Sequence, residues 1–526
     1  MPSYSAIIKN ATIFDGSGDS PKKSDIGIEG DRVAKIGDLN SEHASVEIDA
    51  SGLYAVPGLI DLTNHSDTHW TLFDYPSQEN LLYQGVTTII GGNCGSSLAP
   101  LTRPSDIGDL QKWADVSKAN INWQSFGEFI REVENHRMAI NFGSFVGHGT
   151  ARRASGMDVG LAANQDDLKK ILYLIHASME EGALGISTGL GREHSQAADD
   201  EEVLSILSQV KGLSGTSVHH LADEGAGIVG AVSRIVSLSR ASNSKSHISH
   251  FKVLGKKSWP KQKSALEIIE RARADGLKIT ADFFPYTATG SDLYLLLPEW
   301  AVSGQSSDIL EKLSNDNMKN KITEELRTLT LHYEKIIIAS TLKDTGVIGK
   351  SLKDIADNAG LSPEETIIEL LATNDLQVSI FNEAISEENL FELSKKDYTA
   401  ISSDGYGLSP GKTGSNLTHP RSFGAFSRAF KMLVREMGIL TWEEAVRKMT
   451  ALPAEIAGLN NRGSLKKGFF ADIAVFDPLT IGDTADYKNP SQLSRGIKWV
   501  FVNGIAALVD GTLGAKPGRV IYRNSF

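Results

Sequence analysis

Strand-like and helix-like segments alternate along most of this chain, and the alternation limits the folds open to it. Between Pro57 and Pro453, short apolar runs are followed by stretches with apolar residues at helical spacing, such as 166–181 and 264–275. Eight strand–helix units in succession predict an α/β fold, a TIM-type (β/α)8 barrel with a parallel core. The expected barrel strands are Leu59–His65, Val86–Cys94, Ile140–His148, Ala183–Leu190, Thr216–Leu221, His247–Val253, Ile279–Tyr286 and Thr399–Asp404.

The interval between the seventh and eighth expected strands is unusually long. It runs from Tyr286 to Thr399, far more than one crossover helix needs. We therefore expect an inserted lid or subdomain around residues 290–350. The run Gln377–Phe381 is an alternative candidate for a barrel strand.

Both ends of the chain carry short strands. The first end contains Ala6–Phe14, and the last contains Asp472–Phe476 and a hairpin signal, Asn503-Gly504, between two apolar runs. Neither end has enough strands to bury a core alone. We therefore expect residues 1–56 and 455–526 to pair into one small discontinuous β-sandwich, with residues 57–454 forming the barrel.

Composition excludes several classes of protein. The formal net charge of −12 and the pI near 5.6 argue against a general nucleic-acid binder. A single cysteine rules out an internal disulfide and favours a reducing compartment. The first residues lack the pattern of a signal peptide, and no apolar stretch reaches the roughly 18 residues that span a bilayer. We therefore expect a cytoplasmic protein.

Chemically reactive side chains gather at the carboxyl ends of the expected strands, where barrel enzymes place their chemistry. One thiolate and two imidazoles around a point form a tetrahedral Zn²⁺ site with an open fourth position. A nearby carboxylate can take a proton from water activated by such a metal. The residues concerned are His65, Asp67, Cys94, His148, His220, His250 and Asp404.

Strand geometry narrows this set. His219 and His220 are adjacent and point to opposite faces of a strand, so only one faces the barrel axis. His247 and His250 are three residues apart and also point oppositely, which makes His247 the structural member. Asp404, between Ser403 and Gly405, also has an alternative interpretation as an Asx-turn residue.

A series of short motifs runs in order along nearly the whole chain. The motifs are Pro57–Asp61, Gln84–Thr88, Gly92–Gly95, Gly147–Thr150, Glu181–Gly189, His220 with Asp223-Glu224, Ile248–Lys252, Phe284–Thr287, Ser403–Gly405, His419–Arg421 and Gly468–Asp477. The series resembles the amidohydrolase superfamily, and within it the N-acyl-D-amino-acid deacylases (D-aminoacylases).

The resemblance implies roles for particular residues. A tightly held zinc ion would be bound by Cys94, His220 and His250, and Asp404 would be the general base. The substrate carboxylate would be bound by basic residues, whose matching positions are Lys252 and Arg421, and Arg421 suits this because its planar fork binds a carboxylate bidentately. Tyr286 is a further candidate for hydrogen bonding to the substrate.

The chain departs from the family pattern at the first strand. The family has His-x-His there, and this chain has Thr63-Asn64-His65. We therefore expect one tightly bound metal, with His65 left to orient water or the scissile carbonyl. His69 is an alternative second imidazole. Ala222 stands where the family often has a basic residue, which leaves the side-chain preference for the substrate open.

The function expected from the resemblance is metal-assisted hydrolysis of N-acyl-D-amino acids to a carboxylate and a free amino acid. Asp404 would take the proton of water and return it to the leaving amine. The partner is then a small molecule, without nucleic acid or membrane, and the oligomeric state is open. A cyclic-amide hydrolase of the dihydroorotase or hydantoinase type is an alternative, but those enzymes usually carry a lysine on the fourth strand and Ala183–Leu190 has none. An inactive protein of the same fold is a second alternative.

Overall fold

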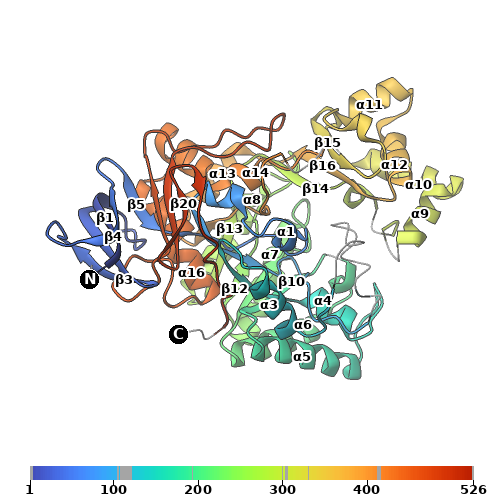
Figure 1. Ribbon diagram of the computed structural model, residues 1–526. Helices are drawn as coiled ribbons and strands as arrows, with labels where there is room; N and C mark the ends of the chain where they lie inside the picture. The colour runs from blue at the N-terminus through green and yellow to red at the C-terminus, as the bar shows by residue number, and fades with distance from the viewer. Residues whose placement is uncertain are drawn as a thin grey trace.

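The computed structural model describes residues 4–523, apart from 104–105, 107–120, 192, 299, 303–305, 330 and 412–415. A ring of parallel strands occupies its centre, with helices outside (Figure 1). These strands are β6 (Leu59–Asp61), β7 (Val86–Gly91), β8 (Asn141–Ser144), β9 (Val146–Gly147), β10 (Gly185–Gly189), β11 (Thr216–His220), β12 (Ser246–Ile248), β13 (Ile279–Phe283) and β17 (Thr399–Ile401).

Two parallel sheets join to close this ring. One has the order β6-β7-β8 and the other β17-β13-β12-β11-β10-β9. Strands β8 and β9 form one barrel strand interrupted at Phe145, whose N–H donates to the Gly91 carbonyl. At the other junction the Asp404 N–H donates to the Thr63 carbonyl at 3.0 Å. The expected (β/α)8 barrel is confirmed. Each expected strand overlaps an observed one, although β12 begins at Ser246, one residue before the expected start.

The helices around the barrel present apolar stripes to the strands. In α5, for example, Ile171, Ile175 and Met179 are buried at helical spacing. The outer helices are α3 (Phe126–Asn135), α5 (Gln165–Glu180), α6 (Asp200–Gly212), α7 (Ile228–Ser242), α8 (Lys261–Ala274), α13 (Glu387–Ser394), α14 (Arg421–Arg428), its π-helical continuation Ala429–Glu436, and α15 (Trp442–Met449). Shorter helices are α1 (Thr71–Asp74), α2 (Glu79–Leu82), α4 (His148–Ala154) and α16 (Ala451–Ala457).

The barrel interior is apolar toward the amino ends of the strands. Its buried cluster includes Ile60, Ile90, Leu184 and Val218, and residues of α16 such as Leu452 pack into the same cluster. The polar side chains of interest follow the carboxyl ends of the strands, so the chemistry of the barrel is confined to that end.

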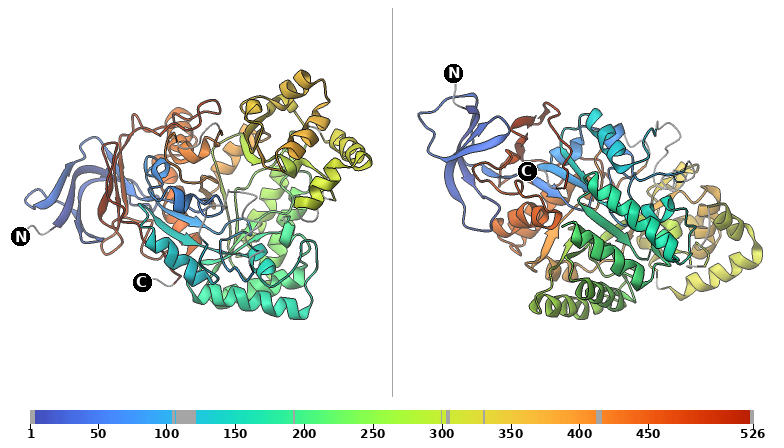
Figure 2. Two further views of the ribbon diagram at one scale, coloured as in Figure 1. Left: turned by 45° about the vertical axis from the view of Figure 1, so that its right-hand side comes forward. Right: turned by 90° about the horizontal axis from the view of Figure 1, so that it is seen from below.

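The two ends of the chain share one sheet beside the barrel (Figure 2). Its order is β21-β20-β19-β18-β5-β1-β2-β3, with β4 paired to β1, so the expected terminal domain is hydrogen-bonded as a single nine-stranded sheet. Asn503 and Gly504 both have positive φ, as the expected hairpin turn requires. The strands are β1 (Tyr4–Ile13), β2 (Lys22–Glu29), β3 (Arg32–Gly37), β4 (Ala44–Asp49), β5 (Tyr54–Pro57), β18 (Ile473–Phe476), β19 (Ile497–Val502), β20 (Ile505–Val509) and β21 (Thr512–Leu513).

An α/β unit is inserted between β13 and β17, on the side of the barrel opposite the terminal sheet (Figures 1 and 2). It has its own buried cluster, which includes Leu313, Ile338 and Ile380. The unit extends beyond the expected 290–350, and Gln377–Phe381 falls largely within its antiparallel sheet, so that run is not a barrel strand. Its elements are β14 (Ala288–Asp292), α9 (Ser306–Ser314), α10 (Asp316–Thr328), β15 (Ile336–Thr341), α11 (Leu352–Ala359), α12 (Pro363–Thr373) and β16 (Val378–Glu383).

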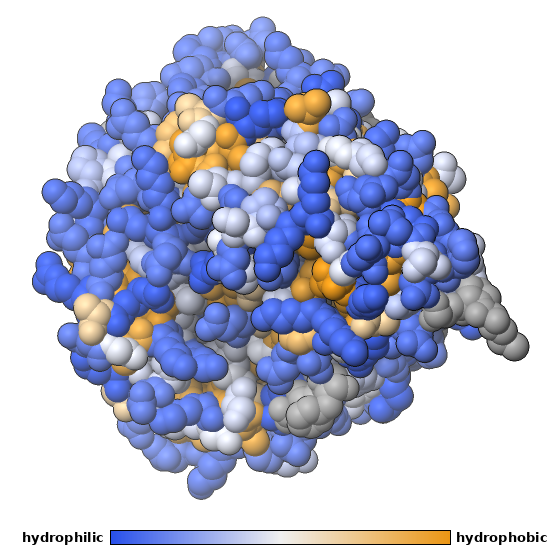
Figure 3. Space-filling model, turned by 90° about the vertical axis from the view of Figure 1, so that its left-hand side faces the viewer, coloured by the Kyte–Doolittle hydropathy of each residue, from blue (hydrophilic) through white to orange (hydrophobic). Residues whose placement is uncertain are grey.

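The side of the molecule that carries the terminal sheet is mostly hydrophilic, with apolar side chains in small separate patches (Figure 3). Two half-exposed apolar residues of this sheet are Ile505 and Val509 on β20. Across the described ranges, no helix has the combination of length and apolar character that a membrane crossing demands.

Candidate active site

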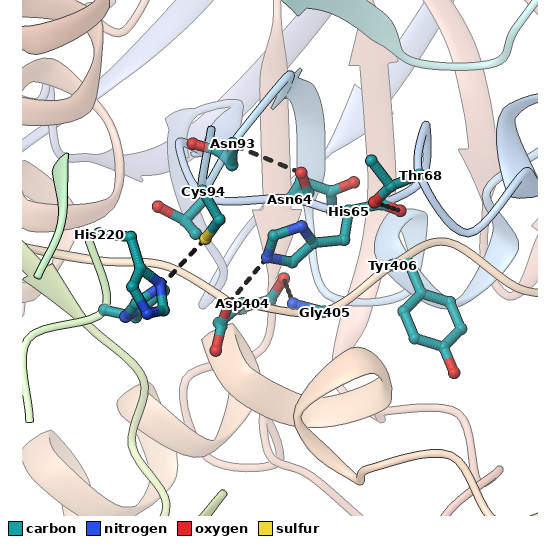
Figure 4. Close-up of polar contacts among 12 residues, drawn as sticks. Asn64, His65, Thr68, Asn93, Cys94, His220, Asp404, Gly405 and Tyr406 are labelled. Carbon is teal, nitrogen blue, oxygen red and sulfur yellow. Dashed lines mark hydrogen bonds and ion pairs between the residues drawn. The ribbon is translucent and has the colours of Figure 1, made fainter. Parts of the chain in front are cut away.

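The structure brings Cys94, His220 and His250 together at the carboxyl end of the barrel. Figure 4 shows Cys94 and His220 facing each other. Cys94 follows β7, His220 ends β11 and His250 follows β12. The Cys94 Sγ lies 3.2 Å from His250 Nε2, and His220 Nδ1 lies 2.8 Å from the same nitrogen. The three donor atoms lie within 4.8 Å of one another, and among the described residues no other group of three or more His, Cys, Asp or Glu side chains does so. One thiolate and two imidazoles at this spacing fit a Zn²⁺ ion.

The backbone at the strand ends is unusual. Cys94, His250 and Asp404 have φ of 55°, 38° and 48°, the left-handed region that residues other than glycine rarely adopt. The chain therefore leaves the sheet abruptly at each of these residues. Gly92 makes the first of these turns feasible, because a Cβ there would lie 1.9 Å from the Phe145 carbonyl oxygen. Such conformations persist only where the surroundings hold them, and they concentrate at functional sites.

Electrostatics favour the ligating form of the cysteine. Burial raises the pKa of the Cys94 thiol, but the charges of His250 and His220 outweigh burial and hold that pKa well below its usual value. The thiolate is the form of cysteine that binds metals.

Asp404 lies between two cationic partners. Its Oδ1 is 3.0 Å from His65 Nε2, and its Oδ2 is 2.6 Å from a terminal nitrogen of Arg421. Burial raises the pKa of Asp404, but Arg421, His250 and His65 hold it well below its ordinary value. Burial lowers the pKa of His65, whereas its hydrogen bonds to Asp404 and Cys94 raise it to about 10. His65 and Arg421 therefore both favour the ionised form of Asp404, and Figure 4 shows the contact between His65 and Asp404 beside Cys94.

The Lys252 ammonium group contacts two other side chains of the protein. Its Nζ lies 2.6 Å from Glu224 Oε1 and 2.9 Å from His250 Nδ1. Glu224 Oε1 also lies 3.1 Å from His250 Nδ1, on the side of the ring away from Cys94. A carboxylate at the second nitrogen fixes the orientation of a ligating imidazole. Sequence reasoning assigned no role to Glu224, although it stands in the quoted motif after His220.

Arg421 begins α14 and lies against the ring of Phe284, with its guanidinium carbon 4.8 Å from the ring centroid. Its Nε is buried and has no hydrogen-bond partner among the residues that the structure describes. The Tyr286 hydroxyl donates to the Pro420 carbonyl at 3.3 Å, directly before this helix. Within the described ranges, no hydrogen bond or ion pair joins Tyr286 to the proposed metal ligands, to Asp404 or to the two candidate carboxylate-binding residues. The hydrogen bond that its hydroxyl makes supports the start of α14.

Other strand-end residues have structural partners. His148 Nε2 lies 2.7 Å from Glu202 Oε1, and Arg152 pairs with the same carboxylate. Asp67 accepts from the Gly92 N–H at 2.6 Å. His219 contacts the hydroxyls of Thr188 and Ser246, and His247 Nδ1 lies 2.9 Å from Thr280 Oγ1.

His69 does not join the cluster of metal donors. Its ring stacks on Tyr406, with the two centroids 4.1 Å apart, and the His65 and His69 centroids are 6.5 Å apart. Thr63, at the position of the absent histidine, donates through Oγ1 to Asp282 Oδ2 at 2.5 Å.

A parallel barrel with a thiolate, two imidazoles and a carboxylate at its carboxyl end has the architecture of a metal-dependent hydrolase. The chain matches the Amidohydrolase family over residues 46–316 and 412–505, and it belongs to that family.

Individual relatives match over almost the whole chain. The D-aminoacylase of Alcaligenes xylosoxydans xylosoxydans is 29% identical over 523 residues, covering 99% of this chain and 98% of that protein. The N-acyl-D-glutamate deacylase of the same organism is 29% identical over 528 residues, covering 99% and 96%. The crystal structure of N-acyl-D-glutamate deacylase from Bordetella bronchiseptica, complexed with zinc and a phosphonate mimic of the tetrahedral intermediate, matches with a TM-score of 0.85 and 26% identity, covering 99% of each chain.

Proposed function

We propose that this protein hydrolyses the amide bond of N-acyl-D-amino acids and releases a carboxylate and the free amino acid. The observation that carries the proposal is the donor set of Cys94, His220 and His250 beside the ion-paired Asp404 and Arg421. The names of the relatives support the same substrate class.

The three donors would hold one Zn²⁺ ion, which when bound lowers the pKa of water and polarises the scissile carbonyl. A single tightly held ion is proposed because Thr63 stands where a second site would need an imidazole. The Thr63 hydroxyl is engaged by Asp282.

Asp404 acts as the general base in this proposal. Its carboxylate takes the proton of the attacking water and returns it to the nitrogen of the leaving amine. His65 holds Oδ1 of Asp404 through its Nε2 and so fixes the orientation of the base. The buried Nε of Arg421 leaves a donor for the α-carboxylate of the substrate, and Lys252 adds positive charge close to His250.

A substrate panel tests the proposed reaction. N-acyl-D-amino acids, their L-enantiomers, dihydroorotate and hydantoins would be incubated with the zinc-loaded protein, and release of the amino group would be measured. We expect turnover of the D-enantiomers and none of the cyclic amides, because β10 lacks the lysine that the cyclic-amide enzymes usually carry. Turnover confined to cyclic amides would contradict the proposal, and so would a zinc-loaded protein that hydrolyses nothing in the panel.

Replacing Arg421 tests the carboxylate-bearing substrate. Arg421→Ala should raise KM for an N-acyl-D-amino acid by roughly 10–100-fold, since hydrogen bonds to charged groups contribute about 1.5–3 kcal/mol. The effect on the corresponding amide or ester should be much smaller, because these lack the charge. Arg421→Lys should also impair binding, because a point charge does not reproduce the bidentate geometry.

A matched control for this experiment is Lys431→Ala. It removes one positive charge from the same helical segment, where Lys431 pairs with Asp483 and not with Asp404. Equal losses for the charged and uncharged substrates of Arg421→Ala would show that the arginine is structural.

A further inference from the structure

Asp282, the fourth residue of β13, is a fully buried carboxylate that the proposed mechanism does not use. It lies among the ends of three barrel strands. Its Oδ2 accepts a hydrogen bond from Thr63 Oγ1 at 2.5 Å, beyond β6, and lies 3.4 Å from His247 Nε2, on β12. Its Oδ1 accepts a hydrogen bond from the backbone N–H of His250. A carboxylate that is buried away from water needs hydrogen-bond donors around it, because burying an unpaired charge costs free energy.

Asp282 binds the backbone on both sides of the His250 α-carbon. The side chain accepts from the His250 N–H, and the Asp282 carbonyl accepts from the Phe251 N–H at 2.7 Å. His250 has a φ of 38°, a conformation that an L-residue keeps only where its surroundings impose it. These two hydrogen bonds fix the peptide groups that set the direction of the His250 Cα–Cβ bond. They therefore aim the imidazole at Cys94 and His220.

Thr63 completes the arrangement. Its hydroxyl is fully buried and donates to the oxygen of Asp282 that does not hold the His250 peptide. A donor at one carboxylate oxygen restrains rotation of the group and so keeps the other oxygen directed at the His250 N–H. Thr63, which replaces a histidine in the first-strand motif, thus influences the metal donor His250 through Asp282.

We propose that Thr63 and Asp282 are positioning residues for His250, and that they set the zinc affinity of the site formed by Cys94, His220 and His250. The inference rests on the proposed function only in taking these three residues as the zinc ligands. In this proposal neither residue is a zinc ligand, and both act through the hydrogen bonds that hold the His250 backbone.

The test compares Thr63→Val, which keeps the shape and removes the donor, with Thr63→Ser, which keeps the donor. Zinc dissociation constants would be measured by competition with a chromophoric chelator. We expect Thr63→Val to weaken zinc binding by about 10–100-fold, as loss of a partner outside the ligand shell does at other metal sites. Thr63→Ser should restore affinity to nearly that of the wild type.

A matched control is Thr216→Val, at the start of β11. It removes a buried hydroxyl that donates to the Ile456 carbonyl at 2.6 Å, at the opposite end of the strand from His220. This variant should bind zinc like the wild type. If Thr63→Val and Thr216→Val bind zinc equally well, the proposal is wrong.

The visible spectrum of the cobalt-substituted protein is a second measurement, and a general loss of protein stability does not change it. At saturating Co²⁺, the visible d–d bands report the geometry of the ligands, so Thr63→Val should change them and Thr216→Val should not. If Thr63→Val does not fold, Thr63→Ala takes its place with the same expectation. Unchanged zinc affinity would overturn the proposal, and so would a weaker affinity with unchanged bands, because the ligand geometry would then be intact. A wild-type protein that fails to bind zinc would instead contradict the proposed function itself.

Discussion

Replacing Cys94 with serine is expected to remove most of the zinc and nearly all of the activity. In the metal-free protein, burial raises the pKa of the Cys94 thiol, but the charges of His250 and His220 outweigh burial and lower that pKa, which favours the metal-binding thiolate. A serine hydroxyl at the same place stays protonated and is a poor ligand. Since metal assistance is worth several kcal/mol, kcat/KM should fall by about 10³-fold or more. Elemental analysis should find about one zinc ion per wild-type chain and far less in the variant.

Cys94 is the single cysteine of the chain, which supplies an internal control. A thiol reagent should label the wild-type protein slowly with zinc bound and faster after chelation, and any labelling reports on this residue alone. Two equally occupied metal ions per chain would contradict the single-ion proposal. Full zinc content in Cys94→Ser would show that the thiolate is not a ligand.

The barrel could be predicted from the sequence because its signal is local and repeated. Apolar, β-branched runs such as Val86–Ile90 suit a strand buried on both faces, and helical periodicity separates one run from the next. The strands end earlier than expected, however. The sequence predicts a strand over Val86–Cys94, but β7 stops at Gly91, because the chain turns away from the sheet before Cys94 enters its left-handed conformation.

The inserted unit could be predicted only in part. Its length was evident, but its extent was not, because Val378–Phe381 has the same local pattern as a barrel strand. The pairing partners decide the matter, and they are β14 and β15 within the insert. Such antiparallel pairing between distant segments leaves no signal in a single run of residues.

The candidate site divides in a similar way. Cysteine and histidine at strand ends could be found by position, and the structure places Cys94, His220 and His250 together. Their roles stay predictions. The residues that hold these donors in place, such as Glu224 and Asp282, could not be found from the sequence. Their contacts depend on which residue of a neighbouring segment points toward the donor. His148 illustrates the limit, since it too follows a strand yet pairs with Glu202 on α6.

Asp404→Asn is expected to lower kcat by about 10²–10⁴-fold, the usual worth of a general acid–base group. The amide has nearly the same shape but cannot accept the proton of water. Zinc content should be unchanged, because the donor set is Cys94, His220 and His250. KM should not rise, since the variant frees Arg421 from its ion pair with Asp404 and leaves it available to the substrate carboxylate. Steady-state kinetics on the zinc-loaded variant separate these effects.

A control is needed because Asp404 is also a buried partner of an arginine, and losing that pair can disturb the fold. Asp483→Asn makes the same chemical change at another buried carboxylate, which pairs with Arg428 and Lys431 beside the helix that carries Arg421. It should keep kcat close to that of the wild type. In the wild-type protein, protonation of Asp404 should limit activity only at acidic pH, because its two direct partners, Arg421 and His65, lower its pKa and oppose the effect of burial. The residual activity of Asp404→Asn should lack this acidic limb. A variant that keeps both the limb and most of the wild-type kcat would show that another group is the base.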